Sequence, residues 1–283
     1  MKDPDTRVNA WRPDLADIRL RGTVRADRFV AGKRRQNTAG SLSLRKAPQP
    51  EARQVSELLH GEIVQVFEIR DGWAWIQSED DLYVGYAAAD RLSEEIHPPT
   101  HRVKALRSFV YPEPDLKSPA LDLLSMNAWV TVTGQDGRFS RLAGGNWMWS
   151  GHLATPGDVE LDHAAVAMRF MGTPYLWGGR TSIGLDCSGL AQMALARCGR
   201  PAPRDSDMQQ ATLGVPVAFD GDESVLNRGD LVFWPGHVGI WLSPDLFVHA
   251  NGSDMMVSAG PLRDIARRIE KETGDPIAAI RRI

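Results

Sequence analysis

One cysteine and two histidines have the residue types and the spacing of a nucleophile with its base. Cys187 lies in Asp-Cys-Ser-Gly-Leu (186–190), where a polar turn gives way to a run with helical periodicity. At the start of a helix, unpaired N–H groups and the macrodipole favour a thiolate, and the same N–H groups can stabilise an oxyanion. The alternative is a small buried residue, which is the usual role of a free cysteine.

His237 and His249 lie on two segments that the sequence predicts to pair as a β-hairpin around Ser-Pro-Asp (243–245). If Leu242 faces Leu246, His237 and His249 lie on one face as diagonal neighbours, with Cα atoms roughly 7–8 Å apart. His237 can then act as a base toward a thiol while His249 orients its ring. Either histidine could instead be a satisfied core residue, and a register slip of one residue would separate them.

The remaining candidates for metal or redox chemistry are weak. The two cysteines do not have the Cys-x2–4-Cys spacing that is typical of zinc ligands. Cys198 follows Cys187 by eleven residues, which on a helix is about 16 Å and too far for a disulfide. We therefore expect no metal and no organic cofactor, and we expect Cys198 to be a core or helix-end residue without a role in the reaction.

The elements that would carry these residues can be read from periodicity. Residues 159–171 have apolar side chains at helical spacing, and a second helix is expected over 188–198. Strand-like runs follow at 230–234, 238–242 and 246–249. Residues 156–283 are therefore expected to form an α+β catalytic domain.

The N-terminal half has a different pattern. Residues 1–36 are charged and Arg-rich, and we expect an extended arm. Short apolar runs at 63–67, 73–76 and 129–132, broken by turn residues, favour small antiparallel β-barrels. Leu-Leu followed 13 residues later by Asp-Gly occurs at 58–72 and again at 123–137, which predicts a duplicated β unit with domains at 37–96 and 97–155.

Composition limits the classes of partner. The 283 residues carry a net charge of −3 with a pI near 6.2, which argues against a sequence-independent nucleic-acid binder. No stretch approaches the ~20 apolar residues of a membrane span. The N-terminus lacks the apolar segment of a signal peptide. We expect a cytoplasmic monomer that binds neither nucleic acid nor membrane.

Four motifs now occur in order: Asp-Cys-Ser-Gly-Leu, Gly-Asp-Leu-Val-Phe-Trp, His-Val-Gly-Ile and Val-His-Ala. Together, over roughly residues 158–283, they resemble the NlpC-type cell-wall cysteine peptidases, which have a papain-like core. The N-terminal half resembles the tandem bacterial SH3-like domains of the branch that cleaves γ-D-glutamyl-L-diamino acid bonds. The expected fold class is therefore α+β, with a papain-like NlpC-type domain preceded by two small SH3-like β-barrels.

The resemblance implies hydrolysis of the γ-D-glutamyl–diamino acid bond in freed murein peptides with an unblocked N-terminal L-Ala. It implies Cys187 as nucleophile, His237 as general base, His249 as the third residue and Tyr175 as a hydroxyl that assists at the oxyanion. The substrate-lining positions that it implies are Asp186, Ser188, Ser206, Glu62 and Tyr83. The last two would come from the first SH3-like domain and reject peptides still joined to muramic acid.

Asp186 has a physical argument of its own. A carboxylate beside the nucleophile raises the pKa of the thiol, so its presence favours recognition of a cation such as the α-ammonium of L-Ala. The alternative is a helix N-cap, for which Asp is well suited. For Glu62 and Tyr83 the alternative is exposed decoration of a strand.

Other functions remain open on the sequence alone. An exported peptidase or amidase that lyses intact peptidoglycan, a non-catalytic wall-binding module, and an acyltransferase on the same core are the alternatives. Whether the third residue of the substrate is diaminopimelate or lysine is also left open.

Overall fold

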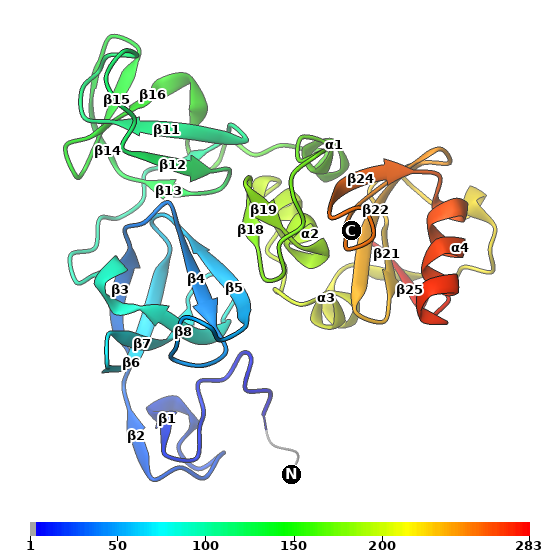
Figure 1. The fold of residues 1–283 in the computed structure, drawn as a ribbon, viewed down its shortest axis with the longest axis horizontal. Helices are drawn as coiled ribbons and strands as arrows, with labels where there is room; N and C mark the ends of the chain where they lie inside the picture. The colour runs from blue at the N-terminus through cyan, green and yellow to red at the C-terminus, as the bar shows by residue number, and fades with distance from the viewer. Residues whose placement is uncertain (1–3) are drawn as a thin grey trace. The chain divides into compact units, whose positions relative to one another are not determined.

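The computed structural model describes residues 4–283, which divide into two compact units, one up to Pro156 and one from Gly157 to Ile283 (Figure 1). The start of the catalytic domain expected at residue 156 is one residue from this division. The content is mixed, with β-structure throughout the first unit and both helices and strands in the second.

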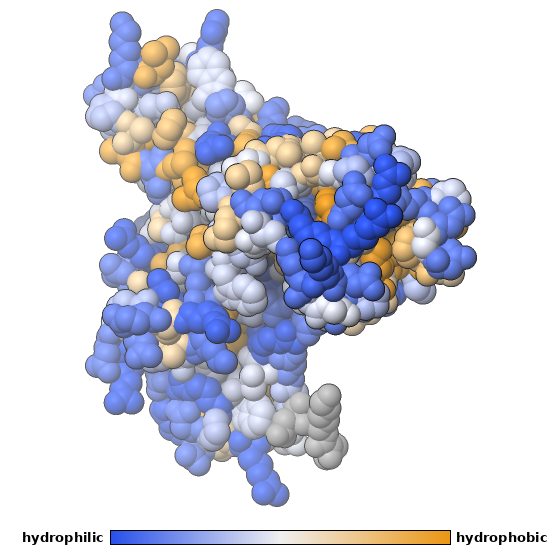
Figure 2. All heavy atoms as spheres, turned by 45° about the vertical axis from the view of Figure 1, so that its right-hand side comes forward, coloured by the Kyte–Doolittle hydropathy of each residue, from blue (hydrophilic) through white to orange (hydrophobic). Residues whose placement is uncertain are grey.

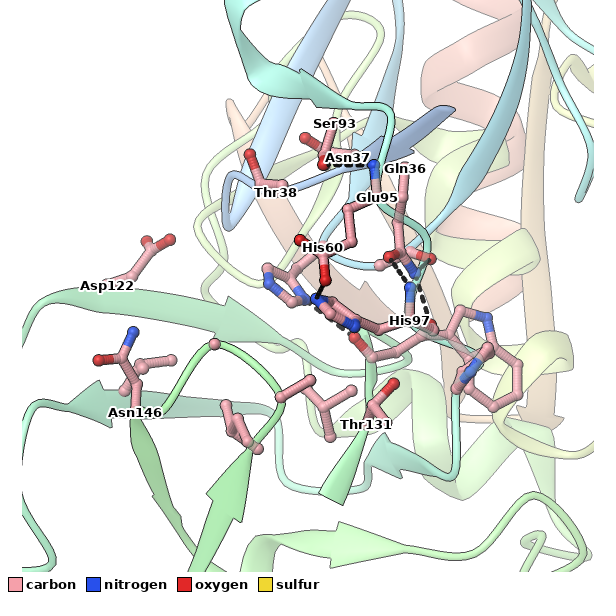
Figure 3. A pocket seen from close by; sticks show the side chains of 18 of the residues that line it. Gln36, Asn37, Thr38, His60, Ser93, Glu95, His97, Asp122, Thr131 and Asn146 are labelled. Carbon is pink, nitrogen blue, oxygen red and sulfur yellow. Dashed lines mark hydrogen bonds and ion pairs between the residues drawn. The ribbon is translucent and has the colours of Figure 1, made fainter. Parts of the chain in front are cut away.

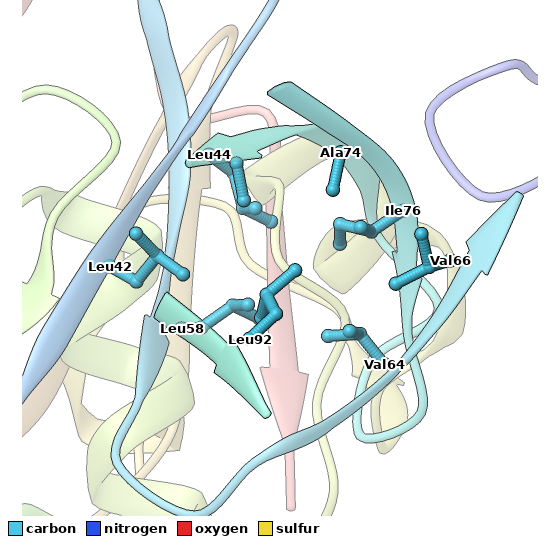
Figure 4. Packing of buried hydrophobic residues seen from close by; sticks show 9 residues of the cluster. Leu42, Leu44, Leu58, Val64, Val66, Ala74, Ile76 and Leu92 are labelled. Atoms are coloured by element: carbon cyan, nitrogen blue, oxygen red, sulfur yellow. The ribbon is translucent and has the colours of Figure 1, made fainter. Parts of the chain in front are cut away.

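The first unit contains a seven-stranded antiparallel sheet in the order β5-β4-β8-β7-β6-β3-β9. Its strands are β3 (Lys33–Asn37), β4 (Ser41–Arg45), β5 (Gln54–Leu59), β6 (Ile63–Arg70), β7 (Trp73–Ser78), β8 (Val84–Ala88) and β9 (Leu92–Ser93). Alternate residues of these strands point inward, as Leu42 and Leu44 do on β4. They meet Leu58, Val64 and Ile76 in one apolar core (Figure 4).

A two-residue turn joins β6 to β7. Arg70 pairs with Trp73 across the turn, and Asp71 and Gly72 both have positive φ, at 50° and 78°. Positive φ at both central positions is the geometry that matches the twist of a hairpin and that Asp-Gly adopts readily. The Asp-Gly pair of the sequence repeat is therefore a hairpin turn in its first copy.

The rest of the first unit repeats this arrangement. A five-stranded sheet has the order β12-β11-β16-β15-β14, which matches the order β5-β4-β8-β7-β6 strand for strand. Its strands are β11 (Arg107–Tyr111), β12 (Asp122–Ser125), β14 (Val132–Asp136), β15 (Phe139–Leu142) and β16 (Trp147–Trp149); a second sheet holds β10 (His101–Val103), β13 (Trp129–Val130) and β17 (Leu153–Ala154). The run expected as one strand at 129–132 is thus broken at Thr131. The assignment of residues 97–155 as a second SH3-like barrel stays a prediction.

The expectation of an extended arm over residues 1–36 was wrong at its C-terminal end. Residues 33–36 belong to β3 and pair with β6. Earlier, β1 (Leu15–Asp17) pairs in parallel with β2 (Arg28–Val30), and the Arg12 guanidinium lies 4.2 Å from the centre of the Trp75 ring. The sequence did not predict this strand because Lys-Arg-Arg at 33–35 has no apolar alternation. These charged side chains are exposed or only partly covered, while Gln36 is buried.

The second unit is built on a six-stranded sheet in the order β20-β25-β21-β22-β23-β24. Its strands are β20 (Val215–Val217), β21 (Leu231–Trp234), β22 (His237–Ser243), β23 (Leu246–Asn251), β24 (Met256–Gly260) and β25 (Ala279–Arg282); its helices are α1 (His163–Met168), α2 (Cys187–Arg197), α3 (Ser206–Thr212) and α4 (Leu262–Thr273); β18 (Arg180–Thr181) and β19 (Gly184–Leu185) form a small ribbon.

Helices cover both sides of this sheet. Figure 1 shows α2 on one side and α4 on the other. Helix α4 buries Leu262 and Ile265 against Trp234 and Phe247 of the sheet. Its remaining positions are mainly charged. Figure 2 shows hydrophilic side chains gathered on the outer surface of this unit. The sheet and α2 together provide the rigid frame for the cysteine and the histidines.

Helix α1 is shorter than the 159–171 expected from periodicity. It begins after Asp162, whose carboxylate accepts from the N–H groups of Ala164 and Ala165. Leu161, counted in the apolar pattern, is 93% exposed. The N-cap therefore decides where the helix begins, and the apolar residue ahead of it does not enter the core. Within residues 4–283, no helix combines the length and the apolar character needed to cross a membrane.

Candidate active site

Cys187 is the first residue of α2. Asp186 is the N-cap, and its carboxylate accepts from the N–H of Gly189 at 2.8 Å. The helix ends at Arg197 with Cys198 as its C-cap, close to the expected 188–198. Cys187 is 7% exposed, and both cysteines are free thiols. The thiol therefore lies where the N–H groups of the first helical turn can act on its charge.

Glycines allow the start of α2 to pack against the segment ahead of it. A methyl group on Gly189 would lie 2.3 Å from the carbonyl oxygen of Gly179. A methyl group on Gly179 would in turn lie 2.6 Å from the Gly184 oxygen. Contacts this short exclude a side chain at either position, so the Gly-Gly and Ser-Gly pairs around the cysteine place α2 directly against backbone.

The two histidines are paired as the sequence predicts. His237 Nε2 lies 2.9 Å from His249 Nδ1, and the ring centroids are 5.1 Å apart. The register of β22 and β23 agrees with the predicted one at Ile240–Val248 and Trp241–Phe247. The predicted pairing of Leu242 with Leu246 was wrong, because a bulge makes Ser243 the partner of Leu246. The bulge lies at the turn end of the hairpin and leaves the histidine end in register.

The sulfur of Cys187 lies against the strand that carries His237. Its thiol donates to the Gly236 carbonyl oxygen at 3.9 Å, and the backbone N–H of Val238 acts on the same sulfur. The residues on both sides of His237 thus contact the nucleophile. Since Nε2 of His237 is engaged with His249, Nδ1 is the ring nitrogen that remains available, and its predicted exchange of a proton with Cys187 stays a prediction.

Burial opposes an isolated charge on either partner. It raises the pKa of Cys187 to about 12, with Asp186 adding to the rise and the N–H groups of Val238 and Ser188 opposing it. It lowers the pKa of His237 to about 4. At neutral pH both groups are therefore uncharged, and a thiolate could form at Cys187 only together with a compensating imidazolium.

His249 is buried and cannot supply a negative charge. Burial and the neighbouring His237 lower its pKa to about 3. When His237 donates from Nε2, His249 Nδ1 accepts, and His249 Nε2 must carry the hydrogen. That Nε2 has no hydrogen-bond partner within residues 4–283. His249 is thus a neutral acceptor for the His237 ring, and its role as the third residue of the site stays a prediction.

Tyr175 lies in the segment that leads to the cysteine, and its N–H bonds to the Met255 carbonyl oxygen at 2.9 Å. Burial raises the pKa of its phenol, and the charges of Cys187 and Asp186 raise it further. The hydroxyl therefore keeps its proton and remains a hydrogen-bond donor close to the nucleophile. This is the property that an oxyanion donor needs.

The side-chain carboxylate of Asp186 accepts five hydrogen bonds. Its carboxylate accepts twice from Arg204, at 2.9 and 2.7 Å, once each from the N–H of Gly178 and Gly189, and once from Ser188 Oγ at 3.3 Å. A carboxylate offers about four lone-pair sites, so all of them are used. The N-cap role is confirmed, and the role of Asp186 in recognising a substrate cation stays a prediction.

Ser188 belongs to this network, and Ser206 follows Arg204 by two residues in the chain. Ser188 Oγ accepts from Arg204 at 2.9 Å, and Ser206 is the first residue of α3 and buried. Gln209 links the two helices, because its Nε2 donates to the carbonyl oxygens of Ser188 and Pro203. Sequence reasoning missed Arg204 and Gln209, although Arg204 stands in the same Pro-Arg-Asp-Ser run as Ser206.

Glu62 and Tyr83 belong to the first unit. Glu62 is 3% exposed and its Oε2 accepts from the Leu59 N–H at 3.0 Å. Tyr83 is 5% exposed, and its backbone bonds to Ser78 and Asp81. The alternative of exposed strand decoration was therefore wrong for both residues. Their role toward a substrate stays a prediction.

The first unit has a cavity of its own, about 270 Å³ in volume. Figure 3 shows Gln36 and His97 on one side of it and Asp122 and Asn146 on the other. His60, whose Nδ1 lies 2.9 Å from the Trp129 carbonyl oxygen, is between them, and burial lowers its pKa. None of the predicted site residues lines this cavity. Among the described residues, no three His, Cys, Asp or Glu side chains are grouped to hold a metal ion.

Comparison with known proteins agrees with this geometry. Residues 172–268 match the NlpC/P60 family, and residues 44–92 match the bacterial dipeptidyl-peptidase Sh3 domain. Dipeptidyl-peptidase 6 of Lysinibacillus sphaericus is 27% identical over 75% of this chain and 86% of its own length. A gamma-D-glutamyl-L-lysine dipeptidyl-peptidase of Bacillus cereus is 26% identical over 74% of this chain, which spans 65% of that relative.

A solved structure has the same fold. The crystal structure of an NlpC/P60 family protein from Bacillus cereus has a TM-score of 0.74 and 21% identity, and the match covers 88% of this chain and 99% of that one. Its fold, the two domain matches and the thiol beside a paired imidazole agree with one another. The chain is therefore a cysteine peptidase with an NlpC/P60 papain-like catalytic domain and a bacterial dipeptidyl-peptidase SH3 domain ahead of it.

Proposed function

We propose that the protein hydrolyses the γ-D-glutamyl–diamino acid bond of freed murein peptides and releases the dipeptide L-Ala-D-Glu. The observation that carries this proposal is the placement of Cys187 at the start of α2 against the strand that bears the paired His237 and His249. Two relatives named as dipeptidyl-peptidases, each aligned over about three quarters of the chain, support it.

The proposed reaction uses these residues in two stages. His237 takes the proton of Cys187, and the thiolate attacks the γ-carbonyl carbon of the D-Glu residue. The N–H groups at the start of α2 and the Tyr175 hydroxyl stabilise the oxyanion. The imidazolium then protonates the leaving amine, and a thioester remains on Cys187. Water, activated by His237, hydrolyses the thioester and restores the thiol.

Recognition of the free N-terminus of L-Ala is the finer part of the proposal. The Asp186 carboxylate has no spare lone pair, so an ammonium must replace one of its donors. The 3.3 Å bond from Ser188 Oγ is the longest of the five and the one that a substrate ammonium would replace. Ser188 could then rotate to accept from the same ammonium, which accounts for a role of both residues in binding.

Glu62 and Tyr83 are proposed to reject peptides whose N-terminus is still blocked. A buried carboxylate and a buried phenol in the dipeptidyl-peptidase SH3 domain are polar groups that packing alone does not require. Their replacement by alanine, together, is expected to reduce the preference for a free N-terminus while Cys187 chemistry continues. Unchanged discrimination in that double variant would remove both residues from the proposal.

The decisive experiment is mass spectrometry of the purified protein with L-Ala-γ-D-Glu-diaminopimelate and with its N-acetylated twin. Release of L-Ala-D-Glu from the free-amine peptide only, lost in Cys187→Ala, is expected. Equal cleavage of both peptides would keep the peptidase and discard the selection of free N-termini, as a lytic enzyme would require. Cleavage of neither would favour an acyltransferase or a binding module.

The same assay with L-Lys in place of diaminopimelate tests the third position of the substrate. The relative from Bacillus cereus is named for the lysine bond. We propose that the bond cleaved is defined by the γ-D-glutamyl side, because the binding residues proposed above, Asp186 and Ser188, would contact the L-Ala end of the substrate. Comparable kcat/KM values for the two peptides are therefore expected.

A further inference from the structure

Arg204 is the most buried charged group next to the nucleophile and takes no part in the reaction described above. Its side chain is 1% exposed, and it lies in the segment between α2 and α3. The guanidinium donates twice to the Asp186 carboxylate, at 2.9 and 2.7 Å. It also donates to Ser188 Oγ at 2.9 Å and to the Gly179 carbonyl oxygen at 3.2 Å.

The partners of Arg204 are residues next to Cys187 in the chain or in contact with the start of its helix. Asp186 and Ser188 are its two chain neighbours, and Gly179 is the backbone against which the start of α2 packs. A buried carboxylate without a counter-charge would place a full negative charge beside the sulfur, where it opposes a thiolate. The planar fork of an arginine matches a carboxylate with two parallel bonds and a defined orientation.

We propose that Arg204 is a positioning residue for the reaction of Cys187: it neutralises Asp186 and holds Asp186 and Ser188 on either side of the nucleophile. The charge of Asp186 is thereby prevented from opposing thiolate formation, although the carboxylate remains in place to cap α2. The proposal concerns the reactivity of the thiol and does not depend on which peptide the enzyme cleaves.

The effects of the two charged groups on the pKa of Cys187 have the signs that this proposal requires. Asp186 raises the pKa of Cys187, and Arg204 lowers it. The other charged or titratable groups that act on the nucleophile or its histidines are Tyr175 ahead of α2, His237 on β22, His249 on β23, Asp254 before β24 and Arg268 on α4. None of these groups forms a hydrogen bond with Asp186, so Arg204 is the group that directly balances the charge of the carboxylate.

The test measures the pH dependence of Cys187 alkylation by iodoacetamide in the full chain. All variants carry Cys198→Ser, so that Cys187 is the one thiol present. Arg204→Gln leaves Asp186 uncompensated, and its alkylation profile is expected to move to higher pH by about one unit, or about tenfold slower alkylation at pH 7. Arg204→Lys restores the charge without the fork and is expected to recover most of the profile.

The substitution Asp186→Asn is expected to shift the alkylation profile in the opposite direction from Arg204→Gln. Asn still caps a helix, while the guanidinium charge is now unbalanced, so the profile is expected to move to lower pH. In the double variant Asp186→Asn/Arg204→Gln both charges are absent, and the profile is expected to return close to that of the parent. A folding defect would not produce shifts of opposite sign that cancel, and the double variant carries the test if Arg204→Gln is unstable.

Arg197→Gln is the matched control. Arg197 is as buried as Arg204 and lies on α2 itself, but its carboxylate neighbours are Asp158 and Glu160. The substitution Arg197→Gln is expected to lower the thermal unfolding temperature of the protein without moving the pH profile of Cys187 alkylation. A profile for Arg204→Gln identical to that of the parent, a shift of equal size in Arg197→Gln, or a double variant that fails to recover would each overturn the proposal.

Discussion

At the scale of single residues, the site is dominated by the cost of charging groups that are buried. His249 is 1% exposed, and its pKa in the folded protein is lowered to about 3 by burial and by His237. In the unfolded chain it titrates near the ordinary value of 6.5. The unfolded state therefore binds more protons than the folded state between these values, and the folded state loses stability as pH falls below about 6.5.

This predicts a specific acid sensitivity. Moving from pH 7.5 to pH 5 is expected to cost about 2 kcal/mol from His249 alone, because one pKa unit corresponds to about 1.4 kcal/mol. His249→Asn keeps an acceptor for His237 but cannot titrate, so its free energy of unfolding is expected to fall less over the same range. Urea unfolding at both pH values, followed by tryptophan fluorescence, measures the difference. Equal losses in the two proteins would contradict the assignment of a buried neutral His249.

At the scale of elements, the position of the nucleophile depends on how closely α2 approaches the segment before it. Gly189→Ala places a methyl group 2.3 Å from the Gly179 oxygen, so the first turn of α2 must move. Overpacking of this kind typically costs about 1–3 kcal/mol, and a displaced sulfur is expected to lower kcat/KM by about 10²-fold.

Gly252→Ala is the control for that substitution. Gly252 has no heavy atom within 4 Å of its Cβ position and follows β23 in the same unit. The same chemical change there is expected to leave kcat/KM unchanged. Kinetics and thermal unfolding of both variants give the comparison, and a Gly189→Ala enzyme with parental kcat/KM would show that the close approach of backbones is not required.

At the scale of the whole molecule, the second unit has a complete fold of its own. All of α1 to α4 and the six-stranded sheet lie within residues 157–283, and the core around Trp234, Phe247 and Leu262 is confined to that unit. We expect the fragment 157–283 to unfold cooperatively and to alkylate Cys187 with the pH profile of the full chain. If Glu62 and Tyr83 select free N-termini, the fragment should cleave the N-acetylated peptide more readily relative to the free one. A fragment without a cooperative transition would show that its fold depends on the first unit.

The local part of the site could be predicted from the sequence because local rules decide it. Cys187 begins a helix since Asp186 is a good N-cap and apolar residues recur behind it at helical spacing. His237 and His249 meet because a short turn sets the register of a hairpin, and a bulge at Leu242 did not disturb its far end. The Asp-Gly pair at 71–72 likewise forms the hairpin turn that its residue types favour.

Tertiary structure alone decided the contacts between residues that are distant in sequence. The sequence places Asp186 beside Cys187 and leaves both a cation-binding and a capping role open; only the fold brings Arg204, eighteen residues later, onto that carboxylate and uses all of its lone pairs. Burial of Glu62 and Tyr83, and of Gln36 and Asn37 at the end of β3, also depends on what packs over them. Periodicity reports which face of an element is apolar, but the partner of a buried charge is chosen by packing in three dimensions, since such a charge must find its counter-charge wherever the fold supplies one.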